Sequence, residues 1–348
     1  MDQLRVGIVG MGIGGIVSRT FSQNPRARVV ALCDLLEARM LTLAAELPEP
    51  VRFFTDYREL CRDPEIDAIF VGTPNQWHVP VAREVVRNGK HVMVTKPLAD
   101  SVAAAQQLVG EAEAAGVVNM MSLSLRYSPE TQYLGRLAAE GTLGEIYYGR
   151  ARSVRRSGIP GRPGFVMAGG GAFRDMGVHF LDGAWWMMGM PRPVSASGVS
   201  GAKFGPHGLG YMRYETPAPE ISRQFAADDY AGGFIRFEND AGLQVESFWA
   251  SHQPEEGQIE LFGTEAGVRL YPPTLYRTQH GAPVDSTITL PKNPNGWEAM
   301  VAHFIACILD GMPCQSPLRH GLIVQEMLEA ILQSAATGRE VTIEPLGS

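Results

Sequence analysis

The first third of the chain alternates short apolar segments with segments of helical periodicity. Continuous apolar segments are typical of strands that are buried on both faces of a parallel sheet. The expected strands are Leu4–Val9, Arg28–Cys33, Ala68–Gly72, His91–Thr95 and Val117–Ser122. The expected helices lie near Ile13–Gln23, Leu35–Glu46, Asp56–Cys61, Val79–Asn88 and Ser101–Ala115. This alternation predicts an α/β domain of the Rossmann type, with a doubly wound parallel sheet, over residues 1–122.

A different pattern begins at residue 123, where longer segments alternate apolar and polar positions. Such alternation is typical of an antiparallel sheet with one solvated face. The expected strands are Ile146–Arg155, Gly232–Glu238, Leu243–Ala250, Gln258–Phe262, Gly267–Tyr271 and Val341–Ile343. The expected helices lie near Ser128–Glu140, Asp175–Gly189, Gly296–Asp310 and Pro317–Thr337, and no element is predicted for Gly201–Ala227. We therefore expect a C-terminal α+β domain with a large, mostly antiparallel open sheet over residues 123–348.

The first expected strand runs into a Gly-x-Gly-x-x-Gly motif, with Ile13 inside it. Gly10 permits a tight turn, Gly12 lets a pyrophosphate approach the backbone, and Gly15 lets the following helix pack near the strand. Asp34 ends the next strand, where a carboxylate suits the ribose hydroxyls of NAD. The motif predicts an NAD site, preferring NAD over NADP; a glycine-rich turn without a ligand is the alternative.

Polar residues follow two neighbouring strands of the predicted parallel sheet. Thr73, Pro74, Asn75 and His78 come after one strand, and Lys96 comes after the next. Ligands of open α/β sheets bind outside the carboxyl ends of strands, so we expect these residues to contact the cofactor. The alternatives are an ordinary loop and a solvated surface lysine.

A glycine-rich segment leads to Asp175 and His179, which are four residues apart in an expected helix and so would share one face. A neutral imidazole can take the proton of an alcohol during oxidation, and a nearby carboxylate can orient it. A helix-capping aspartate and a core histidine are the alternative.

Composition narrows the classes of partner. Hydrophobic residues make up 45% of the 348 residues, charged residues 19%, and the net charge is −7, so we expect a globular protein that binds neither nucleic acid nor membrane. The first strand leaves no room for a signal peptide, and a cytoplasmic location is expected. The cysteines lack zinc-type spacing and are expected to be buried thiols without a metal: Cys33, Cys61, Cys307 and Cys314.

The ordered set of motifs resembles the glucose–fructose oxidoreductase / inositol dehydrogenase / rhizopine-catabolism (Gfo/Idh/MocA) family. The matching positions are Gly10–Gly15, Thr73–His78, Lys96-Pro97, Arg126-Tyr127, Asp175–His179, Asp229-Tyr230 and Ser334–Arg339. The resemblance implies an NAD(P)-binding first domain and a second domain whose sheet forms a substrate wall and often an oligomer interface. It also implies that Lys96, Asp175 and His179 form the catalytic group.

On that resemblance we expect an NAD(P)-dependent dehydrogenase of a sugar, cyclic polyol or related polyhydroxy compound, assembled as a homodimer or homotetramer. Arg126, Tyr127, Arg156 and Phe165 are the candidate substrate contacts. The chain departs from the family pattern at Thr95, where glutamate is usual, and at Ser124, where asparagine is frequent. Two alternatives stay open: an NAD-dependent lyase or glycosidase that works through transient oxidation, and a non-catalytic NAD-sensing regulatory protein.

Overall fold

The computed structural model describes residues 3–291 and 294–345, and it divides the chain into two compact units. The first unit contains the residues up to Ser124 together with Pro294–Gln325, and the second contains the remainder. The sequence had placed all of residues 123–348 in the second domain, whereas residues 294–325 lie with the first unit. The reason is packing: the ring of Phe304 meets the ring of Phe21 edge-on, with centroids 6.3 Å apart.

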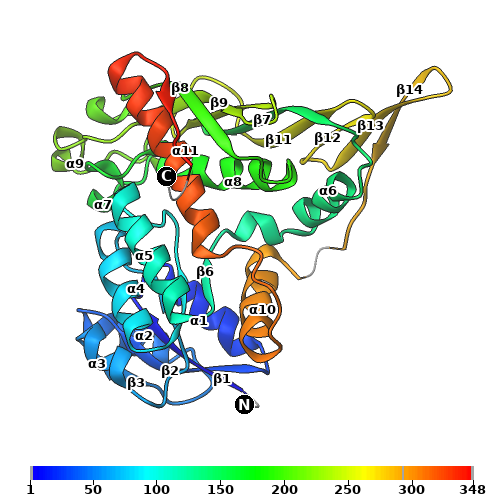
Figure 1. Cartoon of the computed structure of the whole chain (residues 1–348). Coiled ribbons are helices and arrows are strands. Elements are labelled where there is room, and N and C mark those ends of the chain that lie inside the picture. Colours follow the sequence, from blue (N-terminus) through cyan, green and yellow to red (C-terminus); the bar gives the residue numbers. More distant parts are fainter. Residues whose placement is uncertain (1–2, 292–293, 346–348) are drawn as a thin grey trace. The chain divides into compact units, whose positions relative to one another are not determined.

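The first unit is built on a six-stranded parallel sheet in the order β3-β2-β1-β4-β5-β6 (blue to cyan in Figure 1). Its strands are β1 (Leu4–Val9), β2 (Ala27–Cys33), β3 (Arg52–Phe54), β4 (Ala68–Val71), β5 (His91–Val94) and β6 (Asn119–Met121). The five strands expected from the sequence are confirmed. The short edge strand β3 was missed because it has only three residues, none of them buried.

The helices between these strands also follow the predicted pattern. They are α1 (Gly14–Gln23), α2 (Glu37–Ala44), α3 (Tyr57–Arg62), α4 (His78–Arg87) and α5 (Val102–Ala115), joined later in the chain by α10 (Gly296–Leu309). Local signals set their ends. The Ser101 hydroxyl accepts the Ala104 N–H at the start of α5, and Gly116 ends that helix with a φ of 65°.

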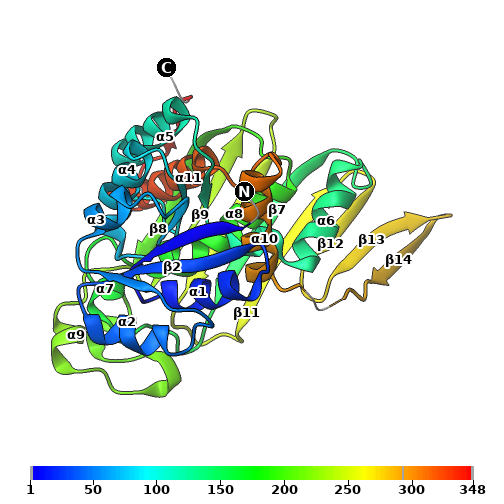
Figure 2. The same ribbon diagram turned by 90° about the horizontal axis from the view of Figure 1, so that it is seen from below.

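The second unit is built on a nine-stranded sheet in the order β14-β13-β12-β11-β7-β10-β9-β8-β15. Neighbouring strands are antiparallel except for β7 and β10, which run parallel. The strands are β7 (Ile146–Val154), β8 (Pro193–Gly201), β9 (Tyr230–Phe237), β10 (Gly242–Phe248), β11 (Glu256–Gly263), β12 (Ala266–Arg269), β13 (Thr274–Gln279), β14 (Ala282–Thr287) and β15 (Val341–Thr342). The predicted open, mostly antiparallel sheet is therefore confirmed. The β13–β14 hairpin forms one end of the sheet (Figure 2).

Helices cover one face of this second sheet. Helices α6 (Pro129–Ala139) and α8 (Val178–Met187) lie along it in Figure 1, and α8 contacts β7 and β11. Helix α11 (Leu318–Thr337), which begins in the first unit, packs against β8 and β9 where glycines leave room. A Cβ atom at Gly198 would lie 2.7 Å from Ile331 Cγ2, and one at Gly233 would lie 2.9 Å from it.

The segment Gly201–Ala227, which the sequence left unassigned, forms short helical turns and α9 (Pro219–Arg223). One carboxylate organises its start. The side chain of the buried Asp229 accepts the backbone N–H groups of Lys203, Phe204 and Gly205. Among the described residues, no helix is long and apolar enough to cross a membrane.

Candidate active site

The glycine loop of the first unit has the geometry that a dinucleotide needs. Gly10 has a φ of +89°, and a Cβ atom there would lie 2.6 Å from the carbonyl oxygen of Gly72. No atom of another segment lies within 4 Å of a Cβ built at the exposed Gly12, so its backbone is open to approach. Ile13 is the residue from which α1 starts, and the first-turn N–H groups of α1 can hold phosphate oxygens.

The close helix–strand packing expected at Gly15 occurs instead at the preceding residue, Gly14. The sequence analysis assigned the close packing of helix on strand to Gly15. A Cβ atom at Gly15 would meet only the end of the Arg19 side chain, at 4.0 Å, whereas one at Gly14 would lie 2.8 Å from Ile8 Cγ2 in β1. Helix α1 crosses β1 at Gly14, so Gly14 is the residue that close packing requires.

Asp34 lies where β2 ends and connects that strand end to the glycine loop. Its carboxylate accepts the Met11 N–H at 2.9 Å and the Leu36 N–H at 3.0 Å. Arg39 Nη1 lies 4.0 Å from the same carboxylate. A carboxylate has about four acceptor positions, so two backbone bonds leave room for ribose hydroxyls.

His78 joins the two polar strand ends instead of facing a ligand. The ring is fully buried, with Nδ1 2.7 Å from the Pro97 carbonyl oxygen and Nε2 2.7 Å from the Thr73 carbonyl oxygen. Burial lowers the pKa of this imidazole, because the protein interior disfavours the charged form. The predicted contact between His78 and a cofactor is therefore replaced by a positioning role for the segments that carry Thr73 and Lys96.

The other predicted residues at these strand ends remain accessible. Pro74 is exposed, and Thr73, Asn75 and Lys96 are half-buried. Thr73 Oγ1 is buried without a hydrogen-bond partner among the described residues, so it can bond to a ligand. This unsatisfied hydroxyl, the open backbone at Gly12 and the Asp34 carboxylate fit a bound dinucleotide.

Asp175 and His179 lie on two different kinds of helix in the second unit. Residues Phe173–Gly177 form a π-helical turn, in which the Val178 N–H bonds to the Phe173 carbonyl, and α8 follows directly. The helix expected over Asp175–Gly189 is therefore present, but its first turn is π-helical and begins at Phe173. Gly177 contributes to the wide turn, because a Cβ atom there would lie 2.3 Å from the Phe173 ring. Single π turns in helices are frequent at functional sites.

The π turn is held by two contacts that the sequence analysis did not predict. Asp175 accepts the Trp249 Nε1–H at 3.0 Å, and Asp228 accepts the Phe173 N–H at 3.0 Å. Burial raises the pKa of Asp228 to about 6. Gly171 has a φ of +119°, and a Cβ atom there would lie 2.0 Å from Asp228 Oδ1, so this glycine permits the close approach of the carboxylate. His179 is half-buried, on the first turn of α8.

A cavity of about 280 Å³ lies beside this turn and was not predicted. Its wall includes Gly170, Arg174, Ser200 and Asp228. The Arg174 guanidinium forms an ion pair with the carboxylate of Glu329 on α11, at 2.8 Å. The sequence signal that could have indicated this wall is the acidic pair Asp228-Asp229, which directly precedes β9. The sequence analysis noted only Asp229.

The four candidate substrate residues separate into two pairs. Arg126 and Tyr127 are buried, and the Arg126 guanidinium donates to the buried Asp182 carboxylate, with an Nε–Oδ2 distance of 2.8 Å. Arg156 and Phe165 are exposed. The Arg126 guanidinium is therefore paired within the second unit, which contradicts the expected substrate contact.

Comparison with known proteins agrees with this reading of the fold. Residues 4–123 match the family described as "Oxidoreductase family, NAD-binding Rossmann fold", and residues 131–269 match the "GFO/IDH/MocA C-terminal domain". The chain is 28% identical to D-glucoside 3-dehydrogenase of Escherichia coli K12, over 98% of this chain and 97% of that protein. It is 28% identical to scyllo-inositol 2-dehydrogenase (NAD(+)) of Bacillus subtilis 168, over 76% and 73% of the two chains.

A solved structure extends the likeness over nearly the whole chain. The crystal structure of GenD2 from gentamicin A biosynthesis in complex with NAD is 25% identical, with a TM-score of 0.81, and the match covers 99% of this chain and 97% of that one. Both units are thus matched, in the order in which they occur here. The chain belongs to the Gfo/Idh/MocA family of NAD-binding oxidoreductases.

Proposed function

We propose that the protein oxidises a hydroxyl group of a sugar or cyclic polyol and passes the hydride to NAD. The observation that carries the proposal is the retention of lysine, aspartate and histidine at the positions of the family motif, at Lys96, Asp175 and His179. The near full-length likeness to a glucoside dehydrogenase supports the substrate class. Retention of all three residues argues against a protein that only senses NAD.

Side chains of the protein would take the proton of the substrate hydroxyl and stabilise its oxygen. His179 is half-buried and takes the hydroxyl proton, and Lys96 donates a hydrogen bond to the oxygen as negative charge develops on it. Asp175, held by Trp249, orients the substrate or one of the other two side chains. When bound, NAD supplies a nicotinamide ring that accepts the hydride.

The activity can be tested with a panel of sugars and cyclic polyols, each offered with NAD and with NADP. Formation of reduced nicotinamide is followed by its absorbance. We expect at least one polyhydroxy compound to give steady formation of NADH. Failure of the whole panel, with NAD binding demonstrated in the same preparation, would contradict the proposal.

Asp34 is expected to make the protein prefer NAD over NADP, because its carboxylate repels a 2′-phosphate. Asp34→Asn keeps an oxygen that can accept the Met11 N–H and removes the charge. We expect this variant to lower the ratio of NAD to NADP affinity by about tenfold, on the scale of one charge-assisted hydrogen bond. The measurement is a titration of each nucleotide by calorimetry.

The matched control for that titration is Glu37→Gln, which removes a charge from the exposed start of α2 and should leave the ratio unchanged. Tighter binding of NADP than of NAD by the unchanged protein would contradict the prediction. So would an equal change of the affinity ratio in both variants.

Assembly into a homodimer or homotetramer is also part of the proposal, through the face of the nine-stranded sheet away from α8. The large apolar side chains of β9, β10 and the residue after them alternate along the chain, at Phe234, Phe237, Val245, Phe248 and Trp249, and would be expected on this face. Phe237, Val245 and Trp249 instead lie in the buried core, while the other two are half-buried.

Aromatic rings gather on this uncovered face. Tyr148 stacks on Phe234, with centroids 6.0 Å apart, and meets Phe262 edge-on at 5.7 Å. Half-buried aromatic rings of this kind are frequent in protein interfaces. We expect Phe234→Glu to convert the assembly to monomers in light scattering at micromolar concentration, while Tyr214→Glu, which changes an exposed ring elsewhere, does not. A monomeric unchanged protein would contradict the prediction.

A further inference from the structure

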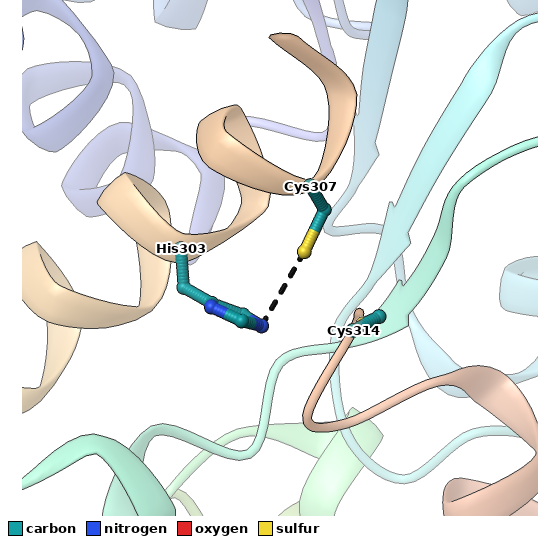
Figure 3. A group of neighbouring side chains, drawn as sticks. All are labelled: His303, Cys307 and Cys314. Atoms are coloured by element: carbon teal, nitrogen blue, oxygen red, sulfur yellow. Dashed lines mark hydrogen bonds between the residues drawn. The ribbon is translucent and has the colours of Figure 1, made fainter. Parts of the chain in front are cut away.

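Three side chains with soft donor atoms converge in the first unit, in a place that the proposed reaction does not use. His303 and Cys307 are four residues apart on α10, and Cys314 lies in the loop before α11. Their donor atoms all lie within 4.8 Å of one another, and Cys307 Sγ is 3.3 Å from His303 Nε2. Figure 3 shows His303 and Cys307 projecting from α10 on the side where the loop carries Cys314.

Both segments that carry these donors are anchored. The loop pairs with the edge strand β6, since the Met121 N–H donates to the Ser316 carbonyl at 2.9 Å and the Ser316 hydroxyl donates to the Met121 carbonyl at 3.0 Å. Helix α10 starts with a capping box formed by Asn295 and Glu298. The three donors are therefore held together by the fold and would need little rearrangement to bind a common ligand.

The three donor groups form a set that suits a divalent cation. Two cysteine sulfurs and an imidazole nitrogen lie close enough together to bind one ion. A divalent cation between them would allow both sulfurs to bind as thiolates.

We propose that His303 Nε2, Cys307 Sγ and Cys314 Sγ bind one soft transition-metal ion, with zinc the preferred occupant. Thiolate and imidazole donors suit zinc. Tetrahedral zinc holds a nitrogen and a sulfur ligand about 3.6 Å apart, close to the 3.3 Å observed here. His303 and Cys314 are only half-buried, so water or an external ligand can complete the coordination.

Binding would replace one hydrogen bond of the metal-free arrangement. The Gln315 N–H donates to His303 Nε2 at 3.0 Å, and the same ring nitrogen lies beside the Cys307 thiol, so two groups compete for one lone pair. With metal bound, that lone pair goes to the ion and the Gln315 N–H can turn to a thiolate. The sequence analysis expected no metal because it considered cysteine spacing alone, and the third donor is a histidine.

The test is a titration of the reduced, chelator-treated protein with Co²⁺, which gives a thiolate-to-cobalt charge-transfer band when it binds cysteine. We expect one equivalent to bind with that band, and Zn²⁺ to displace it. Cys314→Ser and His303→Gln should each weaken cobalt binding at least about tenfold, the lower scale of losing a metal-site interaction. Zinc should also raise the unfolding temperature of the unchanged protein and not of Cys314→Ser.

Cys61→Ala is the matched control, because it removes a buried thiol of the same unit that is not in the cluster, and it should keep the band. NAD binding by each variant shows that the fold is intact. The proposal is overturned if the unchanged protein, with its thiols shown to be reduced, gives no charge-transfer band. It is also overturned if the Cys314 and His303 variants bind cobalt as tightly as the unchanged protein does, or if Cys307 and Cys314 bind metal only after the protein unfolds.

Discussion

Replacement of His179 or Lys96 by alanine is expected to lower turnover by about two to four orders of magnitude, the scale usual for a positioned acid–base or oxyanion group. Neither residue lies in the glycine loop or contacts Asp34 in the described hydrogen bonds, and Lys96 is only one of several residues expected to contact the cofactor. NAD affinity should therefore stay within about threefold of the unchanged protein. The measurements are initial rates on a substrate from the panel and a separate nucleotide titration.

The pH dependence separates the roles of these side chains. The oxidation rate of the unchanged protein should rise with pH as an imidazole loses its proton, because only the neutral ring can accept one. The His179→Ala variant should lose that rise. Asp175→Asn should raise KM more than it lowers kcat if Asp175 acts by orientation. His280→Ala, on the exposed tip of the β13–β14 hairpin, is the control and should leave both constants unchanged.

Near-normal turnover by both alanine variants would show that the assignment of Lys96 and His179 is wrong. A large loss of NAD binding in either variant would also contradict it, since the loss of rate would then follow from the cofactor. Near-normal turnover would favour the alternative that the protein senses NAD without catalysing a reaction.

Asp182→Ala is expected to lower the free energy of unfolding by about 3–5 kcal/mol, the cost of leaving one partner of a buried ion pair without the other. Both side chains of the Arg126–Asp182 pair are almost fully buried, at 0% and 1% exposure. The guanidinium would then stay in the core without the Asp182 carboxylate, and the ring of Trp185, 5.7 Å away, compensates only in part. Unfolding in urea, followed by fluorescence, gives the value.

The exposed pair Glu220–Arg223 supplies the matched control. Glu220→Ala breaks an ion pair whose side chains are 63% and 73% exposed, and it should cost less than about 1 kcal/mol. The double variant Arg126→Met with Asp182→Leu should recover most of the stability lost in Asp182→Ala, since it removes both charges. A loss below about 1 kcal/mol in Asp182→Ala would contradict the account of this pair.

The first unit was predictable from the sequence because its signals are local. Continuous apolar strands, the helical periodicity between them and the glycine motif each act within a few residues, and they predicted the parallel sheet and the loop at Gly10 and Gly12. The strand β3 was missed because three residues, none of them buried, carry no periodicity. The placement of α10 depends on packing against α1, which no local pattern encodes.

The second sheet was harder to predict in detail. β8 is composed mostly of small and polar residues (PVSASGVSG), and its pairing is favoured by α11, whose Ile331 side chain fits over Gly198. The β13 and β14 strands have mostly exposed side chains, so their apolar contrast is weak. Tertiary contacts decide such strands more than intrinsic propensity does.

The residue types of the candidate site stay a prediction, and two of the expected contacts were wrong. Asp34 lies at the end of β2, as the motif predicted. The side chains of His78 and Arg126, in contrast, form hydrogen bonds to other residues of the protein. The sequence around an arginine or a histidine does not reveal whether the fold brings a hydrogen-bonding partner, such as Asp182, next to it. The π turn before His179 depends on the contact between Gly177 and Phe173, which spacing alone does not encode.

The most direct test of the proposed reaction follows the hydrogen itself. A substrate from the panel, deuterated at the carbon that bears the reacting hydroxyl, is incubated with the protein and NAD, and the recovered nucleotide is examined by mass spectrometry. The account predicts one deuterium in the NADH, formed in equal amount with a ketone product, and strong suppression of both in His179→Ala. Elimination or glycoside cleavage without net NADH would contradict it and favour transient oxidation, and unlabelled NAD with no product would contradict catalysis altogether.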